Sequence, residues 1–241
     1  LKTVMSLKLQ PEFKKNLARQ ISLYGILRTV FLKRLESSSS ALTTSLKKYE
    51  KRLGIFEQIL NEQNKIVSLS DIDDIEDEYL EEDGEQIDWT DEKLAKAIEE
   101  KSKPVSDQTH DLIKMKEDIT YEREILKDAI AIAEILKNND VKFDEFLNQL
   151  AEIRKVNPNR KVLIFSFFAD TVIYLEERLT SAKNGFDATN TSFVSGKNKK
   201  DALRSAERFA PIAKQVDMDK KDELTYLFTT DVLAEGQNLQ D

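Results

Sequence analysis

Apolar residues in the first sixty positions recur every three or four residues, which is the period of an α-helix. The run "SSSS" at 37–40 divides this stripe into two halves. The alternation of four and three predicts a heptad seam on a long helix or helix pair. The serines predict either a break in the helix or a point at which small side chains let a neighbour approach. The stripe consists of Phe13, Leu17, Ile21, Tyr24, Leu27, Phe31 and Leu35, followed by Leu42, Leu46, Tyr49, Leu53, Phe56 and Leu60.

Two further helices are predicted in the middle of the chain. The first ends at "NND" (138–140), and the second is stopped by "NPN" (157–159). We expect both apolar stripes to pack in a core. They are formed by Leu112, Met115, Ile119, Leu126, Ala129, Ala133 and Leu136, and by Phe143, Phe146, Leu147, Leu150 and Ile153.

The pattern changes at Arg160, where short apolar runs begin to alternate with amphipathic segments. "KVLIFS" is typical of a strand that is buried on both faces, and "ADTVIYLEERL" predicts a helix. "DATNTSFVSG", "KKDALRSAERFA" and "LTYLF" then predict a second strand, a second helix and a third strand. The sequence therefore predicts an α/β fold, in which a long-helical N-terminal region precedes a βαβαβ unit with a parallel sheet.

All three predicted strands end in small polar residues. Ser166 follows the first strand, Ser195 and Gly196 the second, and Thr229 and Thr230 close the third. The carboxyl ends of parallel strands meet at one edge of a sheet, where open α/β folds bind ligands. Hydroxyl and amide donors suit phosphate oxygens, and a positive field is expected from Lys197, Lys199, Lys200 and Arg204. We therefore expect an anionic ligand at this edge.

The net charge of -8 comes from one segment of the 241-residue chain. Residues 71–92 hold 13 acidic residues and no Lys or Arg, and the rest of the chain has 37 basic against 32 acidic residues. We interpret this segment as a solvated acidic insert in a mildly basic protein. A sharper alternative is that the insert mimics nucleic acid and guards a basic surface.

Several functions are disfavoured by composition. The chain has no cysteine and a single histidine, His110, so we expect neither disulfides nor a metal site, and no apolar run reaches the length of a membrane span. No phosphate-binding loop is present, because Asn198 follows the Gly196–Lys197 pair and Thr191 stands where the first glycine belongs. We expect a cytoplasmic fragment, trimmed at both ends, with no catalytic residues of its own.

The motifs "RKVLIFSFFADTVIYLEERL", "FVSG" and "LFTTDVLAEGQNLQD", in this order, resemble the second RecA-like lobe of superfamily 2 helicases. The nearest branch is the bacterial Swi/Snf-type ATPases. "ILRTVFLKRLESSSSAL" is similar to the helical region that those proteins place between their two lobes. The resemblance implies a helical inter-lobe region at 1–156, which includes the insert at 71–92, and a partial second lobe at 157–241 that stops before motif VI.

The resemblance also assigns roles to residues at the strand ends. Those expected to lie at nucleic acid are Ser166, Phe167, Ser195, Gly196, Lys197, Thr229 and Thr230, and those expected to face a nucleotide are Gly236, Gln237 and Asn238. Glu235 and Asn238 stand where DEAD-box helicases carry arginine and aspartate. Asn238–Leu239 suits the Swi/Snf branch instead, although that branch often has glycines where Leu233 and Ala234 stand.

For the parent protein the resemblance implies ATP and Mg²⁺ as cofactors, held largely by a first RecA-like lobe of the same chain. It implies duplex DNA as the polymer and leaves RNA open; the long helices are the expected dock for a protein partner. The fragment alone is expected to hold no cofactor.

Two other functional classes fit parts of the sequence. A non-enzymatic helical adaptor with an anion-binding α/β domain would account for the heptad seams, the acidic insert and the βαβ unit. It would leave the order and spacing of the motifs in the last segment unexplained. An enzyme complete within these residues, such as a phosphatase, would need a partner carboxylate for Asp231, and the sequence offers none in a suitable frame.

Overall fold

The computed structural model describes residues 25–68, 71, 92–105, 111–181, 186–195, 199–233 and 238–240. The chain forms two compact units, which are described separately below. One unit, here called the helical unit, is Thr43–Ile135. The other, here called the α/β unit, combines the residues up to Leu42 with Leu136–Asp241. The α/β unit thus extends beyond 157–241.

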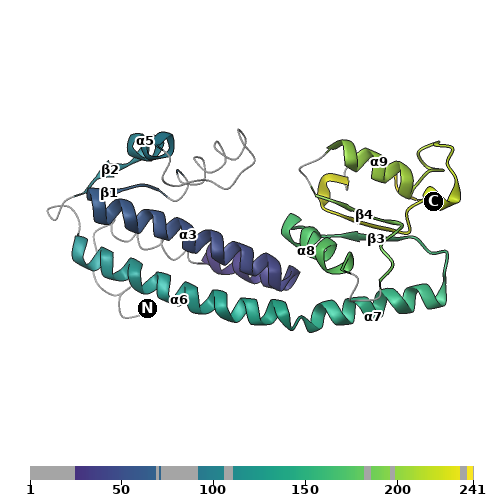
Figure 1. Cartoon of the computed structure of the whole chain (residues 1–241), viewed down its shortest axis with the longest axis horizontal. Coiled ribbons are helices and arrows are strands. Elements are labelled where there is room, and N and C mark those ends of the chain that lie inside the picture. The colour runs from purple at the N-terminus through teal and green to yellow at the C-terminus, as the bar shows by residue number, and fades with distance from the viewer. Residues whose placement is uncertain are drawn as a thin grey trace, which may run out of the picture. The chain divides into compact units, whose positions relative to one another are not determined.

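The described part of the chain is mixed helix and sheet and is mostly helical (Figure 1). Its helices are a segment described over residues 25–37, α3 (Ser39–Gln63), α5 (Glu92–Lys101), α6 (Leu112–Asn138), α7 (Val141–Val156), α8 (Ala169–Leu179) and α9 (Lys199–Phe209), with 3₁₀ turns η1 (Lys220–Asp222) and η2 (Asp231–Leu233). Its strands are β1 (Lys65–Ile66), β2 (Lys103–Pro104), β3 (Val162–Phe165), β4 (Thr191–Val194) and β5 (Tyr226–Thr229).

The α/β unit is built on a parallel sheet of three strands in the order β3-β5-β4. The last strand in sequence therefore lies in the centre, and all four of its residues are buried. Val162 is in register with Tyr226, and Phe165 with Thr229. The three strands and the two intervening helices predicted from the sequence are confirmed, as is the parallel arrangement of the strands.

Alternate residues of the central strand point to opposite faces of the sheet, as the period of a strand requires. Tyr226 and Phe228 pack with α7 and α8, whereas Leu227 packs with α9. Phe228 is completely buried, and its ring lies 4.8 Å from that of Phe193. Burial of one such side chain stabilises the fold by about 1.5–3 kcal/mol. Helices thus cover both faces, which explains why the strands read as continuous apolar runs.

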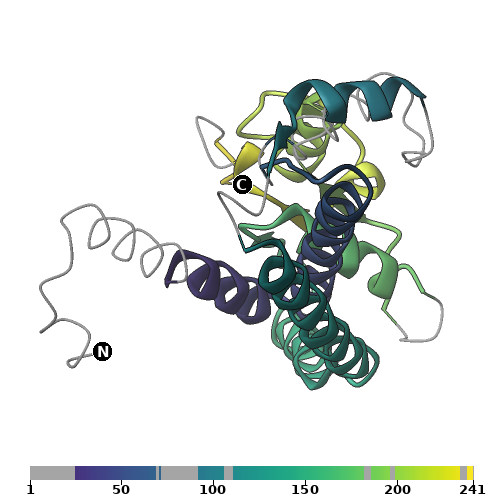
Figure 2. The same cartoon turned by 90° about the vertical axis from the view of Figure 1, so that its left-hand side faces the viewer.

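The helical unit centres on α3 and α6, which lie side by side in both views (Figures 1 and 2). Lys47, early in α3, pairs with Glu134, late in α6, whereas Thr120, early in α6, donates to Glu57, late in α3, so the two helices are antiparallel. The buried residues of α6 are seven apart, as a narrow seam predicts. The seam buries Leu46, Leu53 and Leu60 on α3 and Ile119, Leu126 and Ala133 on α6.

The expectation of core packing is wrong at three positions of the predicted stripes. Leu27, Leu35 and Leu136 are 41%, 42% and 46% exposed. The period of apolar residues identifies one face of a helix, but it does not supply a neighbour to cover that face.

A part-buried ion cluster fastens α3 to α6. The guanidinium of Arg123 donates to Glu50, at 2.7 Å, and to Glu57. Gly54 makes room for it, because a Cβ there would lie 3.1 Å from the guanidinium. Burial acts to raise the pKa of Glu57, but hydrogen bonds from Thr120 and Arg123 outweigh it, so the pKa lies below its ordinary value.

We expect Arg123→Met to destabilise the helical unit by about 1–3 kcal/mol, because two part-buried carboxylates lose their shared donor. Urea unfolding followed by far-UV circular dichroism measures the loss without screening charges. Lys114→Met is the matched control, since it removes an ion pair with Asp118 on the same helix, where both side chains are about two-thirds exposed. Equal stability of the two variants would contradict the assignment.

Candidate functional site

The carboxyl ends of the three strands meet at one edge of the sheet, as the sequence predicted. Phe165 and Val194 are both in register with Thr229. Just beyond the strands, the Ser166 amide donates to the Thr229 carbonyl at 2.9 Å, and the Thr230 amide donates to the Val194 carbonyl at 3.2 Å. The polar residues that follow the strands are therefore neighbours in space.

The two threonines at the end of β5 lie inside this edge. Thr229 is fully buried and Thr230 is 4% exposed. The Thr229 hydroxyl donates to the carbonyl of Thr230 at 3.0 Å, so it serves the local backbone. In this arrangement the pair closes the strand end and does not present its hydroxyls to solvent.

The hydroxyl of Ser166 is also committed within the protein. It donates to the Phe168 carbonyl at 3.1 Å and accepts from the Phe168 amide at 3.2 Å, which shapes the turn between β3 and α8. The next residue, Phe167, is 81% exposed, and its ring lies 5.0 Å from that of Phe168. The side chain that this loop offers to a ligand is therefore aromatic.

A cavity of about 320 Å³ adjoins this loop in the α/β unit. Its apolar wall includes Phe165, which is 50% exposed, and Phe167. The remaining lining residues are Ser37, Ser38, Asp140, Lys142, Phe143, Phe146, Ile164, Ser166, Thr171, Tyr174 and Leu175.

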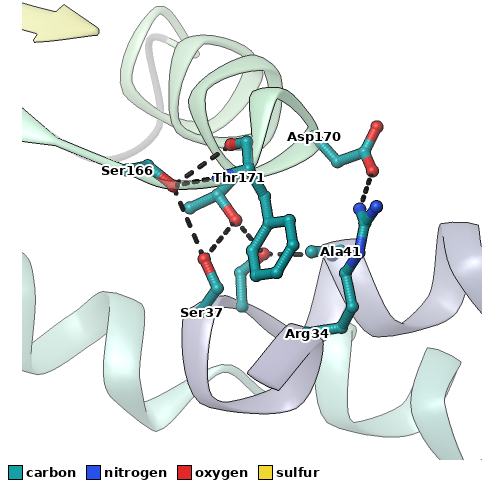
Figure 3. Close-up of polar contacts among 8 residues, drawn as sticks. Arg34, Ser37, Ala41, Ser166, Asp170 and Thr171 are labelled. Atoms are coloured by element: carbon teal, nitrogen blue, oxygen red, sulfur yellow. Dashed lines mark hydrogen bonds and ion pairs between the residues drawn. The ribbon is translucent and has the colours of Figure 1, made fainter. Parts of the chain in front are cut away.

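The serine run forms a joint with the start of α8, shown in Figure 3. Only Ser38 interrupts the helix, and its hydroxyl accepts from the Ala41 amide at 3.0 Å, so that it caps α3. The hydroxyls of Ser37 and Ser38 share hydrogen bonds with that of Thr171, at 2.7 and 2.9 Å. The run is thus both a helix break and a place of close approach, the two features between which the sequence did not decide.

An ion pair reinforces this joint. Arg34 donates to Asp170 at 2.5 Å, and its guanidinium carbon lies 4.2 Å from the centre of the Phe168 ring (Figure 3). Stacking of an arginine on an aromatic face adds to the ion pair. The loop that carries Phe167 is therefore held from both of its flanks.

Asp140 joins three segments of the α/β unit through one carboxylate. It caps α7 by accepting from the Phe143 amide at 3.0 Å, and it also accepts from Tyr174 at 2.8 Å and from Ser39 at 3.0 Å. Burial and the bond to Asp140 raise the pKa of Tyr174 well above its ordinary value. Tyr174 therefore remains a neutral donor over the ordinary pH range.

Four predicted site residues lie outside the described part of the chain. These are Gly196, Lys197, Gly236 and Gln237. Asn238 is described: it is exposed, and its side-chain oxygen accepts from the Gln240 amide at 3.2 Å. Ser195 is half-buried, and Arg204 on α9 is exposed. Trp89, His110 and most of the acidic insert also lie outside the described residues.

The sequence did not indicate the residues that organise this edge, namely Arg34, Asp140, Asp170 and Tyr174. A signal existed only for Asp140, because an aspartate before an apolar helical stripe is a typical cap. Among the described residues, no group of three or more His, Cys, Asp or Glu side chains could hold a metal ion. In the same ranges, no helix is both long and apolar enough to cross a membrane.

Comparison with known proteins adds no family. No protein-family model, no curated protein and no solved structure matches this chain.

We expect Asp140→Ala to destabilise the α/β unit by about 2–3 kcal/mol, because α7 loses its cap and the Tyr174 hydroxyl loses its acceptor. Asp144→Ala is the matched control, since Asp144 is an exposed acid in the first turn of the same helix. A double-mutant cycle with Tyr174→Phe in urea should show coupling between Asp140 and Tyr174. Additive losses would contradict the shared hydrogen bond.

Proposed function

We propose that this chain is the helical region and part of the second lobe of an ATP-driven motor that acts on duplex DNA, as in the Swi/Snf-type ATPases. The alignment of three strand ends in one parallel sheet supports this proposal most directly. The motif "VLIFS" covers β3 and the residue after it, "FVSG" begins in β4, and "TTDVLAEGQNL" begins at the last residue of β5, in the order that the resemblance requires. In such motors, catalysis rests on positioning and charge neutralisation between two lobes.

In this proposal the outer contacts with DNA come from Phe167 and Ser195. Phe167 is 81% exposed at this edge, and Ser195 follows β4 directly. Because Thr229 and Thr230 are buried, a phosphate contact by Thr230 belongs to a DNA-bound state in which this edge rearranges.

The proposal assigns nucleotide contact to Gly236, Gln237 and Asn238. These residues face ATP and Mg²⁺ that the first lobe of the longer protein holds. No catalytic base is assigned to this chain, so the chain alone is inactive.

The deciding experiment is ATP hydrolysis by the longer natural protein, with and without duplex DNA, alongside the 241-residue chain. The proposal expects hydrolysis that DNA stimulates in the longer protein and none by the chain. Duplex RNA and single-stranded DNA in parallel reactions identify the preferred polymer. A longer protein that hydrolyses no ATP with any polymer would refute the motor and favour the helical adaptor.

A second prediction concerns Phe167→Ala in the longer protein. Loss of an aromatic contact should weaken the apparent affinity for duplex DNA by about fivefold, equivalent to roughly 1 kcal/mol. The measurement is the DNA concentration that gives half-maximal stimulation of ATP hydrolysis.

The matched control is Ile212→Ala. Ile212 is 80% exposed in the same unit but lines a hollow at the opposite, amino edge of the sheet. An equal effect of both substitutions would show that general surface hydrophobicity, and not the carboxyl edge, governs the response to DNA.

A further inference from the structure

Helix α6 has a second apolar stripe on the side turned away from α3. Tyr121, Ile125 and Ile132 are 64%, 50% and 60% exposed. Their spacing of four and seven residues places them on one face of the helix. The buried face, marked by Ile119 and Leu126, is a separate one that packs in the helical unit. Three large apolar side chains along three turns form a continuous uncovered face.

Arg123 and Lys127 of α6 lie toward α3, where Arg123 pairs with Glu50 and Glu57 and the charge of Lys127 acts to lower the pKa of Glu57. Two other cations lie nearer the stripe: Lys114 pairs with Asp118 one turn before Tyr121, and Lys116 lines the hollow described below. The acids flank the exposed stripe. By helical position Glu117, Glu124 and Asp128 lie along one side of it and Asp118 and Glu122 along the other, and all five are exposed.

A shallow hollow of about 400 Å³ opens beside the stripe. Tyr121 forms part of its wall, with Glu117 and Glu124 on the same side. An aromatic wall next to two carboxylates suits a lysine or arginine side chain, whose aliphatic stem packs on the ring while its charge meets the carboxylates. The hollow is completed by Asn61, Lys116 and Thr120.

We propose that this face, here called the acidic-flanked stripe, docks a basic amphipathic helix of a partner protein. An apolar face of such a helix covers Tyr121, Ile125 and Ile132, and its lysines or arginines pair with the flanking acids. The negative charge around the stripe favours a basic helix over the other possible ligands. Nucleic acid and anionic lipid are repelled by the five acids, and a second copy of the stripe would bring acids against acids.

The test uses the full chain and a synthetic helical peptide with leucine on one face and lysine along the flanks of that face. A peptide of the same composition, scrambled so that it has no apolar face, is the matched probe. Fluorescence anisotropy should show binding of the patterned peptide and at least about tenfold weaker binding of the scrambled one. Equal binding of the two peptides would reduce the effect to bulk charge and overturn the proposal.

Two sets of variants locate the site. Ile125→Ala combined with Ile132→Ala should weaken the patterned peptide about tenfold without loss of helix, since alanine is the best helix former. Val156→Ala combined with Ile212→Ala is the control, because each of these side chains is 80% exposed in the α/β unit. Equal weakening by both pairs would overturn the assignment to α6.

Reversing the charge of two flanking acids tests the electrostatic part of the proposal separately from its apolar part. Glu124→Lys combined with Asp128→Lys should weaken the lysine peptide and strengthen a glutamate version of the same peptide. Unchanged preference would overturn the proposal. So would chain dimerisation that the Ile125 and Ile132 substitutions abolish, or binding to phosphatidylserine vesicles that exceeds binding to the peptide. None of these readouts depends on ATP hydrolysis or DNA.

Discussion

The carboxylate of Asp140 accepts hydrogen bonds from three segments that are distant in sequence, and the carboxyl edge of the sheet depends on it. It caps α7, whose Phe143 and Leu150 pack against the sheet, and it fixes Tyr174 in the middle of α8. Its bond to Ser39 places the first turn of α3 beside both. A part-buried acceptor that is shared in this way resists replacement, since its loss leaves several donors unsatisfied at once.

Other hydrogen bonds within the unit limit which groups the edge can offer to a ligand. The hydroxyls of Thr229 and Ser166 are used by backbone groups, and those of Ser37 and Ser38 by Thr171. At the surface, the loop after β3 presents the aromatic ring of Phe167, and Asp231 is exposed after β5. If the edge binds DNA, the serine joint lies directly behind the contacting loop. A shift of the helix over residues 25–37 would then reach Phe167 through Thr171 and the Arg34–Asp170 pair, without an intermediate element.

The sequence predicted the strands well because their signals are local. "KVLIFS" and "LTYLF" are short apolar runs, and each is bounded by polar residues, which is typical of strands. The prediction that "KVLIFS" is buried on both faces is wrong, because β3 lies at the edge of the sheet, where no residue of it is fully buried and Phe165 is 50% exposed; the central β5 is buried throughout. The hydrogen-bond partner of a side-chain hydroxyl, by contrast, is not determined by the local sequence. Ser166 bonds to Ser37, 129 residues away, and Arg34 reaches Asp170 across 136 residues, which no period of apolar residues encodes. The helical stripes predicted less. They identified the apolar faces of α6 and of residues 25–37, but they did not predict which of these side chains a neighbouring element covers.

The two proposed ligands have opposite charges, and the two proposals place them on different units. A polyanion binds where phosphates meet donors and cations, whereas the acidic-flanked stripe of the helical unit requires a cationic partner. On α6, Arg123 is used by Glu50 and Glu57 in the contact with α3, whereas Glu117, Glu124 and Asp128 remain exposed away from that contact. If both proposals hold, a nucleic acid and a basic helix would bind to different units and would not compete for one site.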